Sequence, residues 1–346
     1  MTSSILSPRE TGKFVSSKAS NVSIDNTAIE LLASYLADTV EQTALQSVGN
    51  EKCYFPEFSG LTSSQIINCV FIVDALNFNF WTCANEPRYT VTWNKVTGSG
   101  YLGLIQAINR ALANGHAMYN PNYYGQLQAE DLKAMFRSDS GIEIPLLSER
   151  QSVLHEVSQV LIDKFNSSFT EMLEKAAGDA RKLMQLVVEN FPCFKDEAVY
   201  CGTKVSLYKR AQILTADLDL VFAMKGMPRL QNMDTLTMFA DYRVPQVLLY
   251  FGVLVYSASL LENVKDNLVF ANGSNEEVEI RACSIEAVER LVQSCRQQLQ
   301  DRGWSKARAL SSVSSVQVDY LLWEYRLANA EKLVKIPYHK TRCIFY

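Results

Sequence analysis

The sequence lacks the features that mark secreted and nucleic-acid-coating proteins. Residues 1–13 contain no apolar stretch of the kind that a signal peptide requires. There is no excess of positive charge either, because 33 Lys and Arg stand against 37 Asp and Glu, for a net charge of −4. A protein that binds a long run of phosphates normally carries a basic excess. We therefore expect no stable polynucleotide binding, whereas small or singly phosphorylated partners remain open.

Long uncharged runs are also scarce in the chain. The longest lies between Arg243 and Glu262, and Pro245, Gln246 and Gly252 interrupt it. A membrane span needs about 20 predominantly apolar residues. We therefore predict a buried helix in this run, with a membrane span as the weaker alternative, and no membrane partner.

Cysteine and histidine are not arranged as metal ligands. The eight cysteines include no C-x-x-C pair, and His116, His155 and His339 lie in separate segments. This usage favours reduced thiols in a cytoplasmic protein and argues against a disulfide framework or a metal site. The fingerprints G-x-x-x-x-G-K-[ST], G-x-G-x-x-G and G-x-S-x-G are absent too, so we expect no cofactor and chemistry carried by carboxylates.

Helical periodicity dominates a chain that is 48% apolar and 20% charged. We predict a mainly α fold with small β insertions, placed as hairpins near 88–100 and 199–208. Residues 1–25 are expected to form a flexible polar lead, and residues 26–346 a single compact domain. The sequence predicts no particular oligomeric state.

Individual helices are predicted from their capping signals and apolar spacing. Thr27–Glu30 forms a capping box ahead of Leu31, Leu32, Tyr35 and Leu36, which we expect on one apolar side. The other predictions are a capping signature at Ser148–Gln151, a helical run over 169–191, a cap at Ser284 and a final helix over 316–335.

Four segments combine polar and aromatic residues more densely than packing alone requires. In the first, Asp74 and Asn77 precede Trp81 within a run of large aromatics. An acid and an amide beside aromatic faces suit a flat heterocycle, which needs stacking and hydrogen bonds at its edge. Alternatively, Asp74 caps a helix while the aromatics fill the core.

The second segment places two cations, Lys209 and Arg210, at the start of a predicted helix. Cations at a helix N-terminus oppose its dipole, so a carboxylate or a substrate anion is expected to compensate them. The alternative is a solvated pair of surface charges.

The third segment contains Asp241 just upstream of the helix whose first turn holds Pro245. The helix dipole favours the ionised form of an acid at this position. An anionic carboxylate beside aromatics is what a reaction that builds positive charge on a sugar requires. The alternative is a helix cap, with Tyr242 and Arg243 as packing and salt-bridge partners.

The fourth segment is the C-terminal region. Asp319, Trp323 and Arg326 stand at i, i+4 and i+7, so one helix face would present an acid, an indole and a guanidinium. A basic and aromatic tail follows, which is suited to binding one phosphate or, alternatively, to docking as a charged terminus. Its members are Tyr338, His339, Lys340 and Arg342.

These segments together resemble the queuosine salvage protein family, whose members are queuosine 5′-phosphate N-glycosylases. The similarity extends from about residue 60 to the end of the chain. It implies a helical fold akin to helix–hairpin–helix DNA glycosylases and hydrolysis of the bond between queuine, a 7-deazaguanine derivative, and ribose 5-phosphate. Freed queuine can then be reinserted into tRNA. The motifs that carry the resemblance are VFIVDALNFNFW (70–81), YKRAQILTAD (208–217), MFADYRVPQVL (238–248), VDYLLWEY (318–325) and IPYHKTRCIFY (336–346).

The resemblance assigns the family's essential Asp to Asp241 and its partner Lys to Lys209. The other predicted substrate-binding residues fall into groups for the edge of the base, for stacking and for the phosphate. They are Asp74, Asn77 and Asp319 for the edge, Phe239, Trp81 or Trp323 for stacking, and Arg243, Tyr338, His339 and Arg342 for the phosphate, together with Tyr242.

Two other functions compete with a hydrolase that acts on a small-molecule substrate. A glycosylase for polymeric nucleic acid would need a basic groove, which the net charge of −4 disfavours. A non-catalytic binding protein for a modified deazapurine nucleotide would need the aromatic and acidic pocket, but not Lys209 together with Asp241.

Overall fold

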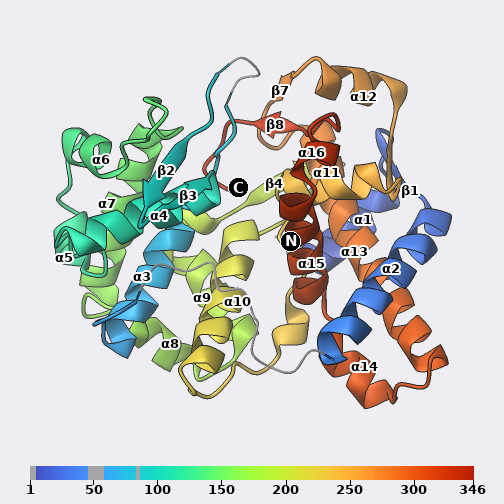
Figure 1. Cartoon of the computed structure of the whole chain (residues 1–346), viewed down its shortest axis with the longest axis horizontal. Helices are drawn as coiled ribbons and strands as arrows, with labels where there is room; N and C mark the ends of the chain where they lie inside the picture. Colours follow the sequence, from blue (N-terminus) through green and yellow to red (C-terminus); the bar gives the residue numbers. More distant parts are fainter. Residues whose placement is uncertain (1–4, 46–57, 83–85) are drawn as a thin grey trace. The chain divides into compact units, whose positions relative to one another are not determined.

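The computed structural model describes residues 5–45, 58–82 and 86–346, and the chain is mainly helical (Figure 1). Its residues divide into two compact units, each assembled from segments far apart in sequence. The single compact domain predicted for residues 26–346 stays a prediction. The first unit comprises Met1–Glu51, Asp196–Lys209 and Asp234–Arg342, and the second comprises Lys52–Lys195, Arg210–Met233 and Cys343–Tyr346.

The first unit is organised around α13 (Asn275–Asp301), a helix of 27 residues. Its side chains are buried through most of the first five turns, because other helices of the unit pack against it, α1 and α2 most extensively. The remaining helices of the unit are α1 (Pro8–Ser16), α2 (Asn26–Leu45), α11 (Arg243–Tyr250), α12 (Ala258–Lys265), α14 (Lys306–Ser312), α15 (Ser315–Ala328) and α16 (Ala330–Leu333).

Three strand pairs belong to the first unit. The antiparallel hairpin of β4 (Glu197–Tyr200) and β5 (Thr203–Ser206) confirms the insertion predicted near 199–208. The other two pairs join distant segments: β1 (Val22–Ile24) runs antiparallel to β6 (Leu254–Tyr256), and β7 (Val269–Phe270) runs parallel to β8 (Lys340–Thr341).

The N-terminal region differs from the flexible polar lead that the sequence predicted. Helix α1 and strand β1 both lie within residues 1–25, and Thr11 and Val15 are buried. Gly12 lets α1 approach α13 closely, since a Cβ at this position would lie 3.1 Å from the backbone nitrogen of Glu286. The polar composition therefore reflects one solvated face of an amphipathic segment.

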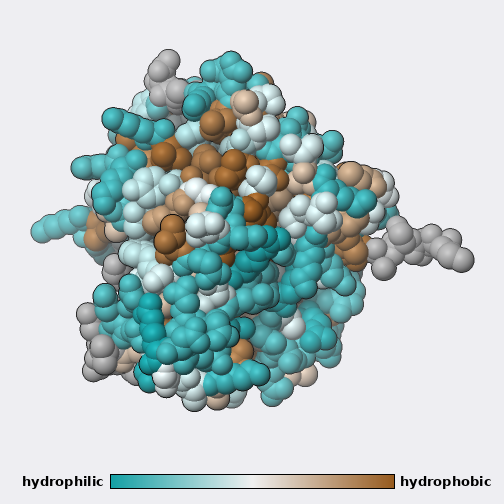
Figure 2. All heavy atoms as spheres, turned by 90° about the vertical axis from the view of Figure 1, so that its right-hand side faces the viewer, coloured by the Kyte–Doolittle hydropathy of each residue, from teal (hydrophilic) through white to brown (hydrophobic). Residues whose placement is uncertain are grey.

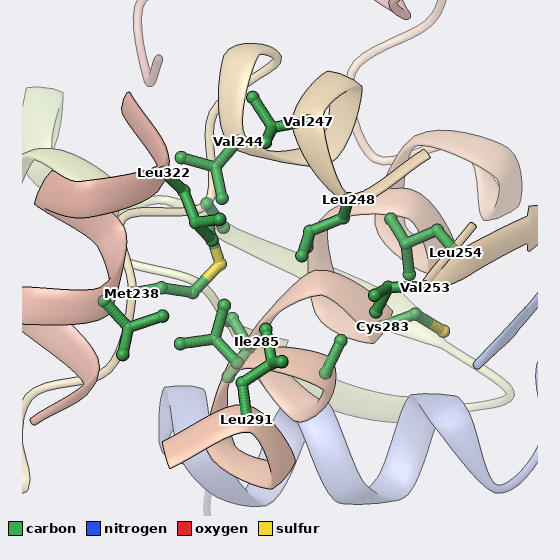
Figure 3. Close-up of a cluster of buried hydrophobic side chains, with 14 of the residues drawn as sticks. Met238, Val244, Val247, Leu248, Val253, Leu254, Cys283, Ile285, Leu291 and Leu322 are labelled. Carbon is green, nitrogen blue, oxygen red and sulfur yellow. The ribbon is translucent and has the colours of Figure 1, made fainter. Parts of the chain in front are cut away.

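A continuous hydrophobic core underlies the segment that carries Asp241 (Figure 3). Met238 lies before this residue and Val244 after it, and both side chains point into the cluster, close to Leu322 of α15. Burying a side chain of this size contributes roughly 1.5–3 kcal/mol. The backbone is thus anchored on both sides of Asp241.

The uncharged run from 243 to 262 is not the one long helix that the sequence predicted. Helix α11 ends at Tyr250, and Gly252 adopts a left-handed conformation with φ 72°. The N–H of Val253 then donates to the carbonyl of Leu248 at 2.9 Å. This is a glycine-based helix stop, and it redirects the chain into β6 and α12. Among the described residues, no helix combines the length and apolar character that crossing a membrane demands.

Helix α2 buries a different stripe from the one predicted. Leu32 and Leu36 are buried, whereas Leu31 and Tyr35 are 70% and 46% exposed. Ala33 lies near the middle of the buried stripe, and at 100° per residue Leu31 and Tyr35 each lie about 160° away from it, near the opposite side of the helix. Figure 2 shows one face of the molecule, on which apolar residues gather in the upper half and hydrophilic ones cover the lower half.

In its described residues, the second unit consists of helices and one hairpin. Four phenylalanines pack together in its core, with ring centroids 4.3 Å apart for Phe71 and Phe169 and 5.0 Å apart for Phe71 and Phe191. The antiparallel hairpin of β2 (Thr90–Trp93) and β3 (Val96–Ser99) confirms the insertion predicted near 88–100. The helices are α3 (Ser63–Ala75), α4 (Tyr101–Ala113), α5 (Pro121–Tyr124), α6 (Ala129–Met135), α7 (Leu147–Lys164), α8 (Thr170–Ala176), α9 (Ala180–Asn190) and α10 (Lys209–Met224), whose first residue belongs to the first unit.

Candidate active site

Asp241 caps the N-terminus of α11. Its Oδ1 atom accepts the backbone N–H of Arg243 at 2.7 Å and that of Val244 at 3.0 Å. These bonds confirm the capping alternative. Because both bonds go to Oδ1, the cap fixes the orientation of the half-buried carboxylate without engaging Oδ2. Capping and a catalytic role are therefore compatible.

A second acid, Asp319 of α15, lies near Asp241. Asp319 is 5% exposed, and its Oδ2 atom accepts the backbone N–H of Phe239 at 2.9 Å. Burial raises the pKa of Asp319 well above its usual range, the negative charge of Asp241 raises it further, and Lys209 opposes the shift. The fold of the first unit thus brings Lys209, Asp241 and Asp319 within electrostatic range of one another. A buried acid with a raised pKa favours its protonated form, which can donate a hydrogen bond.

Lys209 is held at the first residue of α10. Its backbone N–H donates to Oδ2 of Asp196 at 3.2 Å, so a carboxylate compensates the helix start. Lys209 and Arg210 are only 6% and 1% exposed, and the solvated surface pair considered from the sequence is therefore wrong. Lys209 and Asp241 act on Asp319 in opposite directions, since Lys209 lowers the pKa of this acid and Asp241 raises it.

Arg243 lies against two tyrosines that the sequence placed in the site. Its guanidinium carbon is 5.0 Å from the ring centroid of Tyr242 and 4.2 Å from that of Tyr338. The two tyrosine rings stack with centroids 5.5 Å apart. Lys340 approaches the Tyr338 ring at 5.5 Å while its Nζ donates to Oδ1 of Asn267 at 2.7 Å. Two cations therefore share one aromatic ring in the predicted phosphate region.

His339 and Arg342 occupy opposite environments. His339 is fully buried, and burial, assisted by the charge of Arg281, lowers the pKa of its imidazole to about 3. A neutral imidazole can form a hydrogen bond to an anion but adds no positive charge. Arg342 is exposed.

The predicted stacking residues of the first unit also differ in burial. Phe239 is 3% exposed and meets Tyr320 edge to face, with centroids 5.9 Å apart. Trp323 is half-buried on α15, one turn after Asp319. Phe239 is thus packed into the unit, whereas the indole of Trp323 retains accessible surface.

Asp74, Asn77 and Trp81 lie in the second unit, at and after the end of α3. All three are buried, and the amide of Asn77 donates to Oδ1 of Asp74 at 3.4 Å. The loop between them includes Asn79 in a left-handed conformation with φ 47°. Its backbone N–H donates to the carbonyl of Tyr346 at 2.9 Å, so the C-terminus helps to fix this loop.

Two buried arginines of the second unit hold this loop. Arg150 donates to the carbonyls of Leu76, Phe78 and Asn79, at 2.5 Å for Phe78 and 3.3 Å for Asn79. Arg210 donates to the carbonyls of Ala75 and Cys193. The sequence treated Arg150 as part of a capping signature and missed this role. No local signal could have revealed it, because its partners lie more than 70 positions away.

A separate cavity of about 260 Å³ lies in the second unit and contains none of the predicted site residues; Arg110, His116, Tyr123 and Arg137 are among its lining residues. Across residues 5–45, 58–82 and 86–346, no group of three or more His, Cys, Asp or Glu side chains is arranged to hold a metal ion.

Comparison with known proteins identifies the family. The family model described as "Queuosine salvage protein" matches residues 59–346, which is most of the chain. The chain belongs to this family. It is 37% identical to a queuosine 5′-phosphate N-glycosylase/hydrolase of Bos taurus over 342 residues, which is 99% of each chain. The relative of the same name from Nematostella vectensis is 34% identical over 100% of each chain, and that from Sphaerobacter thermophilus is 36% identical over 81% of each. Membership of the queuosine salvage family confirms the resemblance on which the sequence prediction rests.

Proposed function

We propose that this protein hydrolyses the N-glycosidic bond of queuosine 5′-phosphate and releases queuine and ribose 5-phosphate. The observation that carries the proposal is the similarity, at 34–37% identity over almost the full chain, to relatives named for this activity. We further propose that the protein works in the cytoplasm, that freed queuine returns to tRNA, and that the fold is akin to helix–hairpin–helix DNA glycosylases.

Asp241 is the proposed catalytic carboxylate. When the glycosidic bond breaks, its electron pair leaves with the base and positive charge develops on the ribose ring. A carboxylate aimed at this charge stabilises the transition state, and its prior fixation by the helix avoids reorganisation during the reaction. We assign this task to Oδ2, since Oδ1 is engaged by the backbone of α11.

The same carboxylate can orient the attacking water or accept its proton. The water oxygen forms the new bond to the ribose, and the second product is the base, which takes up a proton in place of the sugar. A 7-deazapurine lacks the ring nitrogen that purine hydrolases can protonate, so help for the leaving group must come from other contacts at its edge. Asp319 suits this role, because its raised pKa favours a proton that can be shared with the base.

The remaining residues are proposed to bind and orient the substrate. Lys209 supplies a positive charge that acts on Asp319, and Arg243 with Tyr338 provides a cationic and aromatic surface for the 5′-phosphate. Three further groups of predicted residues remain part of this proposal. They are His339 and Arg342 for the phosphate, Trp323, Phe239 and Tyr242 for stacking or contact, and Asp74, Asn77 and Trp81 for the base.

The test is to incubate the protein with queuosine 5′-phosphate, queuosine or GMP and to detect free base by mass. Asp241→Asn should reduce queuine release by at least roughly 10²–10³-fold, the cost of losing one preorganised electrostatic group, while nucleotide binding stays measurable. The matched control is Asp179→Asn, because Asp179 caps α9 by accepting the N–H of Lys182 at 3.0 Å and lies outside the predicted site. It should keep wild-type turnover.

Three outcomes would contradict the proposal. Unchanged turnover in Asp241→Asn would reject this residue as catalytic. Binding of queuosine 5′-phosphate without base release by the wild type would favour the binding-protein alternative. Base release only from an oligonucleotide, with salt-sensitive binding, would favour the glycosylase for polymeric nucleic acid.

A further inference from the structure

One buried guanidinium in the first unit connects the two segments that carry the proposed catalytic pair. Arg281 of α13 is 1% exposed, and its Nε donates to the carbonyl of Ala240 at 2.8 Å, one residue before Asp241. Its Nη1 and Nη2 atoms donate to the two carboxylate oxygens of Asp196 at 3.0 and 2.5 Å. A planar fork of this kind fixes distance and direction together.

Asp196 continues the connection to Lys209. The carboxylate oxygen that accepts Nη2 of Arg281 also accepts the backbone N–H of Lys209 at 3.2 Å. The backbone carbonyl of Asp196 accepts the N–H of Leu207 at 2.9 Å, which holds the strand end just before Lys209. A chain of hydrogen bonds therefore runs from Ala240 through Arg281 and Asp196 to Lys209, and it lies within one unit.

We propose that Arg281 and Asp196 are positioning residues for the glycosidic cleavage, acting through the backbones of Asp241 and Lys209. This inference rests on the proposed function. Neither residue contacts the reacting atoms in the mechanism above; their task is to hold the carboxylate and the cation at a fixed separation. Displacing a reacting group by about 1 Å can reduce the rate by roughly 10²-fold, so even a small shift at Arg281 should affect turnover.

The same ion group contains a branch that does not lead to the catalytic pair. Glu277 accepts Nη1 of Arg281 at 2.8 Å and is as buried as its partner. Its other carboxylate oxygen accepts the N–H of Gly273 at 3.1 Å, just before α13 begins. A change at Glu277 perturbs the buried ion group and the stability of the unit, but not a bond to the segment of Asp241 or Lys209.

This branching allows a matched test with three variants: Arg281→Lys, Asp196→Asn and Glu277→Gln. Lysine keeps the charge but cannot bind Ala240 and both oxygens of Asp196 at once. Arg281→Lys and Asp196→Asn should lower kcat for queuine release by roughly 10²-fold with KM changed only a few-fold. Glu277→Gln should keep the wild-type kcat of the folded protein even if urea unfolding shows reduced stability.

Several results would overturn the inference. One is a wild-type kcat in Arg281→Lys; another is a fall of kcat in all three variants in proportion to their lost stability. If Arg281→Lys fails to fold, Asp196→Asn still decides, because it leaves the bond from Arg281 to Ala240 and weakens only the branch to Lys209. Wild-type protein and Asp241→Asn are assayed in parallel. No queuine from the wild type would reject the proposed function itself, whereas an active wild type, an inactive Asp241→Asn and a fully active Asp196→Asn would reject only the positioning role.

Discussion

The two tasks of Asp241 can be separated by comparing Asp241→Ala with Asp241→Asn. Alanine removes both the charge and the cap, because no side-chain oxygen remains for the N–H groups of Arg243 and Val244. Asparagine removes the charge but caps a helix about as well as aspartate does. Both variants should therefore lose turnover to the same extent, while only the alanine variant should lose stability through the cap.

The expected magnitudes follow from the contacts. Loss of the cap in Asp241→Ala should lower the free energy of unfolding by about 1 kcal/mol, within a range of roughly 0.5–2 kcal/mol. Asp241→Asn keeps the cap and loses a charge–dipole interaction of about 0.3–1 kcal/mol. Its stability should therefore stay closer to that of the wild type than the stability of Asp241→Ala does.

The assay combines urea unfolding, followed by circular dichroism, with queuine release measured on the same preparations. Asp179→Ala is the matched control, since it removes from α9 a capping carboxylate that accepts the N–H of Lys182, and it should cost a similar free energy with full activity. Equal destabilisation by Asp241→Ala and Asp241→Asn would refute the capping argument. Turnover that survives in either variant would refute the requirement for the charge.

Two further predictions concern buried charged groups. Asp319→Asn should gain stability relative to the wild type as pH rises above 3.8, the ordinary pKa of Asp. Because the pKa of Asp319 is raised in the folded protein, this acid contributes fully to wild-type stability below its unfolded pKa. The contribution is lost as pH rises through the folded pKa. Urea unfolding at pH 4 and pH 7 measures this, and a difference that does not change with pH would contradict it. Arg150→Met should destabilise the second unit by about 3 kcal/mol or more, because several buried carbonyls lose their donor. Exposed Arg137→Met is its control and should stay within about 0.5 kcal/mol of the wild type.

Local signals predicted the two hairpins and several of the longer helices but misplaced the start of α13. The sequence placed a cap at Ser284, whereas the helix begins ten residues earlier, with Ser274 accepting the N–H of Glu277 at 3.4 Å. Ser284 lies inside the helix and donates its hydroxyl hydrogen to the carbonyl of Ile280 at 2.7 Å. A serine before an apolar run satisfies either geometry, so the pattern alone could not distinguish a cap from an interior serine.

The run over 169–191 shows a second limit of periodicity. The sequence predicted one helix, and the structure has α8 and α9 instead, separated by Ala177 and Gly178 with φ values of 52° and 74°. The apolar positions continue across the break because both helices bury residues such as Met172 and Leu183. The spacing of apolar residues cannot reveal a helix break that preserves the burial pattern.

Of the two proposed catalytic residues, only Lys209 violates a local rule, because a cation at a helix N-terminus opposes the helix dipole. Asp241 obeys the capping rule, and the resemblance to the family distinguished it from an ordinary cap. Arg281 gave no such signal, since an arginine within a polar helix is ordinary, and its partners Ala240 and Asp196 lie 41 and 85 positions away. The positioning contacts depend on the tertiary fold, which the spacing of residues in one segment does not contain.

The pairing of two acids gives a physical reason to connect this arrangement with glycosidic chemistry. Burial raises the pKa of Asp319 and the negative charge of Asp241 raises it further, so the arrangement disfavours ionisation of Asp319. A helix cap alone would gain nothing from a second acid, because ionising both acids would place like charges together where the local dielectric is low. A ribosyl cation beside Asp241 would offset its charge, and a protonated Asp319 would be able to share its proton with the departing base. The feature that costs stability in the resting protein is therefore the one that the proposed transition state relieves.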